Sequence, residues 1–107
     1  MPHYVVRMTH PPDQCPTANS KTRQMMQQAG TEFPKLAEKL GIKFVAGPYV
    51  LAAEHDGIAV VEAERVEQVE EFVLQSGMVQ WNSVRITTAR PVQEAVEMLN
   101  TLPPPLY

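Results

Sequence analysis

His10 and Cys15 lie five positions apart in the proline-rich segment HPPDQCP, residues 10–16. Imidazole nitrogen and thiolate sulfur are both ligands of transition metals, and His55 in the turn EHDG offers a third. The prolines fix φ, so little conformational entropy is lost when this loop binds a ligand. We therefore predict that these three residues bind one transition-metal ion. Water or a carboxylate would be the fourth ligand, the candidates being Asp13, Glu54 and Asp56.

The same residues allow two other interpretations. Cys15 precedes a predicted helix, whose N-terminus lowers a thiol pKa, and a histidine could act as its base. The thiol would then be a nucleophile or a redox group, although acidic neighbours raise a thiol pKa. No second cysteine is available to resolve a sulfenic acid. The simplest interpretation is a stiff loop with a small buried thiol.

A second set of residues is suited to a small planar or anionic molecule, because arginine binds carboxylates and tryptophan stacks on flat rings. The candidates for this pocket are His3, Arg7, Tyr49, Trp81 and Arg85. The alternative is that Arg85 pairs with a glutamate such as Glu62 while Trp81 packs in a subunit interface. For acid–base catalysis the candidate groups are His3, His10, His55 and Tyr49.

The elements that must position these residues follow from apolar periodicity and from the glycine and proline breaks. Strands are expected over residues 3–9, 42–53, 57–63 and 80–89, and helices over residues 17–40, 65–76 and 92–99. Thr17 is the expected N-cap of the first helix. Pro34 removes a backbone donor, so we expect that helix to kink or break between residues 30 and 34 and to leave an opening over the sheet. Pro48 places its strand at an edge or bends it.

The order β-α-β-β-α-β predicts a ferredoxin-like α+β fold, with a four-stranded antiparallel sheet, both long helices on one face and a C-terminal helix added. In this fold the first and third strands are central neighbours that run antiparallel. The end of residues 3–9 therefore lies beside the turn before residues 57–63. This neighbourhood brings His10 and Cys15 toward His55.

The sheet is expected to have a second apolar face, because apolar side chains point to both sides of the second and third strands. Residues 44 and 45 of FVAGPYVL are apolar on opposite faces, as are Ile58 and Ala59. An antiparallel sheet with one wet face normally alternates apolar with polar residues. A homodimer with twofold symmetry is the commonest way to bury such a surplus.

Two segments resemble a known family. The turn and strand EHD-GIAVVEA, residues 54–63, resemble the hallmark of the GYD family, in which Glu or Gly, Tyr and Asp precede an apolar strand ending in Glu-Ala. The segment SVRITTA, residues 83–89, is similar to that family's last strand. The resemblance implies a dimeric α/β barrel, in a superfamily that includes small monooxygenases, muconolactone isomerase and haem-dependent chlorite dismutases. His55 stands where the family has tyrosine, and the HPPDQCP loop is outside the family pattern.

Length and composition limit the remaining possibilities. The 107 residues predict one domain, and a net charge of −3 with no basic cluster argues against nucleic acid as a partner. No apolar run could span a membrane and no signal peptide is evident, so a cytoplasmic location is expected. We expect a small dimeric α/β-barrel protein that binds a small ligand or a metal ion between helices and sheet. The alternatives are a cofactor-independent monooxygenase or isomerase, and an assembly subunit that docks a protein partner.

Overall fold

Four antiparallel strands form a single sheet in the order β2-β3-β1-β4. The computed structural model describes residues 1–107, and its strands are β1 (His3–Thr9), β2 (Lys43–Leu51), β3 (Asp56–Glu62) and β4 (Ser83–Ala89). Its helices are α1 (Ser20–Lys39), α2 (Val66–Gln75) and α3 (Val92–Met98). The predicted ferredoxin-like α+β class is confirmed by this element order and sheet topology.

The register of the sheet decides which loops meet at its end. Thr9, the last residue of β1, is paired with Asp56 at the start of β3 and with Ser83 at the start of β4. The next backbone amide, from His10, donates to the carbonyl oxygen of His55 at 3.2 Å. The segments that follow β1 and precede β3 and β4 therefore converge at one end of the sheet, as predicted for His10 and His55.

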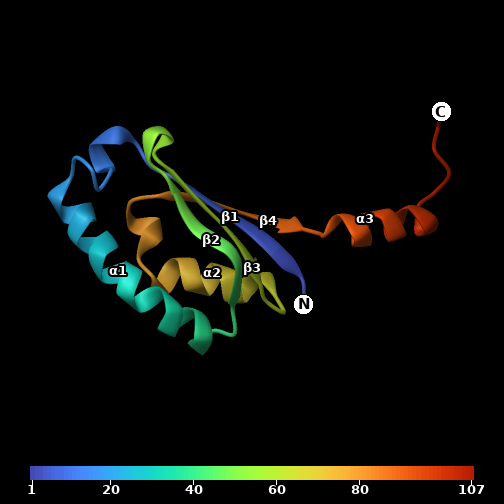
Figure 1. The fold of residues 1–107 in the computed structure, drawn as a ribbon, viewed down its shortest axis with the longest axis horizontal. Helices are drawn as coiled ribbons and strands as arrows, with labels where there is room; N and C mark the ends of the chain where they lie inside the picture. Colours follow the sequence, from blue (N-terminus) through green and yellow to red (C-terminus); the bar gives the residue numbers. More distant parts are fainter.

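Helices α1 and α2 cover one face of the sheet and enclose the hydrophobic core (Figure 1). Alternate residues of the central strands, such as Tyr4 and Val6 of β1 and Ala59 and Val61 of β3, are buried there. Burial of Val69 and Val73 holds α2 against the same face. The alternation leaves the intervening residues, including Val5 and Val60, on the other face of the sheet.

The prediction of a break in the first helix is wrong. Helix α1 is continuous through Gly30 and Pro34, so no opening forms at a break there. Both residues lie on the exposed side, where water can bind the carbonyl group that Pro34 cannot pair. The N-cap is Asn19 rather than Thr17, since the Asn19 side chain accepts hydrogen bonds from the amides of Lys21 and Thr22.

The start of the fourth strand also differs from prediction. Strand β4 begins at Ser83, because Gly77 ends α2 in a left-handed conformation and a 3₁₀ helix, η3 (Met78–Gln80), follows. Trp81 therefore lies before the strand rather than in it. Strand β2 is an edge strand with register shifts on either side of Ala46, which agrees with the edge position and bend predicted from Pro48.

Helix α3 and the residues after it extend away from the rest of the molecule (Figure 1). The radius of gyration is 16.3 Å, compared with roughly 13 Å expected for a compact domain of this length. The apolar side chains of Val92, Val96 and Leu99 are mostly exposed on this arm. None of the helices is long and apolar enough to cross a membrane.

Candidate metal centre

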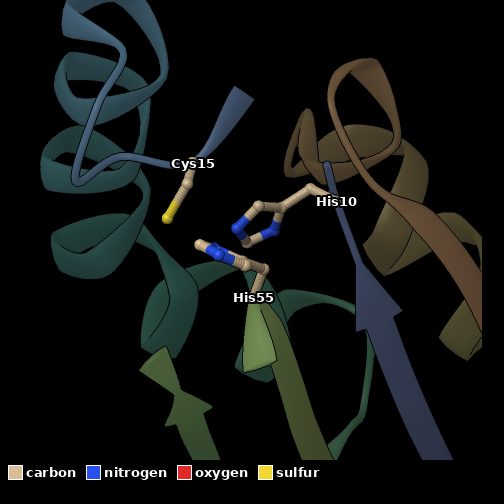
Figure 2. A group of neighbouring side chains, drawn as sticks. All are labelled: His10, Cys15 and His55. Atoms are coloured by element: carbon tan, nitrogen blue, oxygen red, sulfur yellow. The ribbon is translucent and has the colours of Figure 1, made fainter. Parts of the chain in front are cut away.

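The side chains of His10, Cys15 and His55 meet at the end of the sheet where β1 ends and β3 begins (Figure 2). One potential ligand atom from each residue lies within 4.8 Å of those of the other two. Cys15 is buried, and both histidines are half-buried. The structure thus brings together the three residues predicted from the sequence to form one site. We call them the His10–Cys15–His55 cluster.

A hydrogen bond to Asn82 orients the His10 ring. The Asn82 side-chain nitrogen donates to the carbonyl of Met78 at 3.1 Å, which leaves its oxygen as the acceptor toward His10. His10 Nδ1 lies 2.9 Å from that oxygen and therefore carries the ring proton. The lone pair is then on Nε2, which is buried without any hydrogen-bond partner. Metal-binding histidines are commonly fixed in this way through their second nitrogen.

The backbone of His55 is in the left-handed conformation, with φ 58°. It follows the 3₁₀ helix η2 (Ala52–Glu54), and its carbonyl holds the His10 amide across the two segments. Its ring nitrogen Nδ1 is buried and has no hydrogen-bond partner. Buried polar atoms are rarely left unpaired in proteins. Two unpartnered imidazole nitrogens thus lie beside one thiol.

Hydrogen bonding favours the thiolate form of Cys15. The Thr17 hydroxyl donates to the Cys15 sulfur at 3.0 Å. The pKa of Cys15 is lowered to about 6, mainly by hydrogen bonds from the Thr17 side chain and backbone amide, with smaller contributions from His55 and His10 and against the opposing effect of burial. The cause is thus mainly Thr17 rather than the start of α1, which lies beyond it at Ser20. The thiolate is the form of cysteine that binds metals.

The spacing of the cluster is close to that of a metal site. Zinc–sulfur and zinc–nitrogen bonds of about 2.0–2.3 Å place two ligands of a tetrahedral ion roughly 3.5 Å apart. The widest spacing in the cluster, 4.8 Å, exceeds that value by about 1 Å. Small side-chain rotations would close the set around one ion.

The cluster forms one wall of a cavity of about 140 Å³. The remaining wall is almost entirely apolar and comes from α1, β2 and the segment around η3, including Met26, Phe33, Leu51, Met78 and Trp81. The rings of His10 and Trp81 are in contact, with centroids 5.0 Å apart. A metal in the cluster would therefore present its free coordination position to a confined apolar space.

The expected carboxylate ligand does not join the cluster. Asp13 and Glu54 are exposed, and the group of neighbouring ligand atoms contains no carboxylate. Asp56 lines the cavity, but one of its oxygens lies 3.2 Å from the Arg7 guanidinium. The donor set is one sulfur and two nitrogens.

The second predicted set of residues is divided between the two faces of the sheet. Trp81 and Tyr49 line the cavity, whereas His3, Arg7 and Arg85 do not. Arg7 and Arg85 are paired positions in β1 and β4 and are exposed on the face opposite the helices. His3 lies 3.2 Å from Glu62. The predicted pocket that combined Arg7, Arg85 and Trp81 is therefore not formed within one chain.

The sequence interpretation missed Asn82 and Thr17, which orient His10 and bond to Cys15. Asn82 was predictable in principle, because antiparallel pairing of Thr9 with Ser83 makes His10 and Asn82 neighbours. Thr17 is the predicted N-cap of the first helix, but in the structure its hydroxyl donates to the Cys15 sulfur.

Comparison of the chain with protein-family models and with curated proteins finds no match. The resemblance to the GYD family stays a prediction.

Proposed function

We propose that this protein binds a metal ion through His10, Cys15 and His55. The observation that supports the proposal most strongly is the pair of buried, unpartnered imidazole nitrogens beside a buried thiol, with one potential ligand atom from each residue within 4.8 Å of the others. A merely structural cluster would leave those nitrogens unsatisfied at a cost in stability. A bound cation would satisfy all three groups together.

The donor set also limits the kind of metal. Thiolate and imidazole ligands suit zinc, copper and iron, whereas magnesium and calcium prefer oxygen ligands. Three protein ligands leave a fourth position open, which is typical of catalytic or ligand-binding sites rather than of structural zinc. The proposed function is therefore metal binding, with room for a small molecule in the adjoining cavity.

The test is a titration of metal-free protein with Zn²⁺ and with Cu⁺, in competition with chromophoric chelators. We expect one ion per chain in the wild type. Replacing Cys15, His10 or His55 by alanine should abolish tight binding, and Asn82→Ala should weaken it about 10–100-fold by releasing the His10 ring. His3→Ala is the matched control, because His3 pairs with Glu62 away from the cavity. Equal affinity in the wild type and the Cys15 variant would contradict the proposal.

A second candidate function is thiol nucleophilic catalysis. The hydrogen bond from His10 to Asn82 gives the order Cys15, His10, Asn82, which resembles the cysteine–histidine–asparagine arrangement of papain-like enzymes. In that case His10→Ala should slow alkylation of Cys15 in metal-free protein, and no metal should protect the thiol. Protection of Cys15 from iodoacetamide by one equivalent of metal would instead favour the metal centre.

We also propose that the chain forms a homodimer through the sheet face that the helices leave open. Val45 is about half exposed there, at 49%. Val5 and Val60 are paired on β1 and β3, which lie next to each other in the centre of the sheet. An apolar face of this kind on an antiparallel sheet is normally covered, and a second copy presents a matching surface.

A further inference from the structure

Three of the six methionines line the cavity beside the proposed metal centre, although they are far apart in the sequence. Met8 comes from β1, Met26 from α1 and Met78 from η3, and all three line the cavity that the His10–Cys15–His55 cluster faces. Met78 is buried. This arrangement is not predictable from the sequence, because no two of these residues have a spacing typical of a methionine-rich metal motif.

We propose that the centre is a copper site that holds Cu⁺, with a methionine thioether from this group as the additional ligand. The proposal rests on the metal-binding function above and identifies its metal. Soft thiolate and thioether ligands select Cu⁺, and a set of two histidines and one cysteine with a weak methionine is a recognised copper geometry. The cavity wall adds three thioether sulfurs to the possible donors. Of the side-chain oxygens beside them, those of Thr17, Asp56 and Asn82 are already hydrogen-bonded.

The charge of the site favours Cu⁺ over a divalent ion. Two neutral imidazoles and one thiolate bind Cu⁺ as an uncharged unit, whereas Zn²⁺ would leave a net charge of +1. An uncompensated charge is costly in an apolar cavity. Asp56 is the one acidic side chain in the cavity wall, and it is already paired with Arg7.

Methionine is also a common filler of irregular hydrophobic space, and Met8 packs against the core. Substitution by leucine distinguishes a packing role of these methionines from a metal-binding role. It keeps the apolar volume and usually changes stability little. Loss of the sulfur atom then affects copper binding without removing the packing.

The experiment measures Cu⁺ and Zn²⁺ affinities anaerobically in the wild type, in Met8→Leu, Met26→Leu and Met78→Leu, and in the triple variant. Met98→Leu is the control, because Met98 lies in α3, outside the cavity wall. We expect the wild type to retain Cu⁺ in the presence of equimolar Zn²⁺. The triple variant and at least one single variant should lose about 10-fold in Cu⁺ affinity, with Zn²⁺ affinity unchanged.

Two results would overturn the inference while leaving the metal centre intact: displacement of Cu⁺ by Zn²⁺ in the wild type, or unchanged Cu⁺ affinity in the triple variant. Absence of binding of either metal to the wild type would instead contradict the proposed function itself. The wild-type competition needs no variant, so it decides the question even if a methionine substitution impairs folding.

Discussion

At the scale of single residues, Thr17 has the largest effect on whether the Cys15 thiol is ionised. Its hydroxyl and backbone amide hold the pKa of Cys15 near 6, below the ordinary value of 9.0. The thiolate therefore predominates at neutral pH without a metal. Because folding lowers this pKa, the thiolate stabilises the folded chain fully above the pKa of the unfolded thiol. That contribution is lost as the pH falls through about 6.

Thr17→Val should raise the pKa of Cys15, because valine keeps the shape of threonine but cannot donate to the sulfur. The pH dependence of iodoacetamide alkylation in metal-free protein measures this value. We expect a midpoint near pH 6 in the wild type, a higher midpoint in Thr17→Val and a nearly unchanged one in Thr17→Ser. Identical midpoints in all three proteins would show that Thr17 does not stabilise the thiolate.

At the scale of elements, two glycines lead to opposite predictions, because Gly30 lies inside the continuous helix α1 and Gly77 lies in the turn after α2. A side-chain carbon added to Gly30 would meet nothing within 4 Å, and alanine favours a helix over glycine by about 0.5–1 kcal/mol. Gly30→Ala should therefore raise the free energy of unfolding by that amount. Gly77 has φ 80°, where alanine is strained, so Gly77→Ala should lower it by about 1 kcal/mol or more. Urea denaturation measures both changes.

A Gly30→Ala variant that is less stable than the wild type would contradict a helix that continues through this position. The parallel measurement on Gly77→Ala shows that the assay detects a strained backbone.

Element order was predictable from periodicity, and it was enough to bring His10 and Cys15 toward His55. That prediction needed only β1 and β3 to be antiparallel neighbours, which the register confirms. The two wrong predictions, for Pro34 and Trp81, rested on a single residue or on alternation alone and not on the surrounding structure. Pro34 was expected to interrupt α1, but its exposed position lets water replace the missing bond. Trp81 was placed on a strand face by counting alternation through a 3₁₀ helix that the sequence pattern does not signal.

The side-chain environment of the cluster was less accessible to sequence reasoning. Met26 and Met78 reach the cavity only because α1 and the segment after α2 pack over the same end of the sheet. Such convergence depends on helix placement in three dimensions, which spacing within one helix does not specify. The same applies to the Thr17 hydroxyl, which bonds to a sulfur two residues away.

At the scale of the whole molecule, the open sheet face and the extended α3 arm both leave apolar side chains exposed. If a second copy covers the sheet face, each protomer should bury about 800 Å². Val60 lies near the centre of that face, paired with Val5 of β1 and Ala46 of β2.

Val60→Asp should convert the dimer into a monomer, because dimerisation would bury an unpaired carboxylate. Sedimentation velocity at micromolar concentration gives the oligomeric state. Leu74→Asp is the control, since Leu74 is exposed on α2 on the helix side of the sheet. A monomeric wild type, or a dimer that survives Val60→Asp, would be inconsistent with packing through this face.

Identifying the atoms that coordinate an added metal ion is the most direct test of the proposed metal centre. X-ray absorption at the metal edge of protein loaded with one equivalent of Cu⁺ or Zn²⁺ identifies the coordinating atoms and their distances. The structure predicts one cysteine sulfur at about 2.3 Å and two imidazole nitrogens at about 2.0–2.1 Å for zinc, with at least the same three ligands for copper. A first shell without sulfur, or with only oxygen and water ligands, would contradict a centre built from His10, Cys15 and His55.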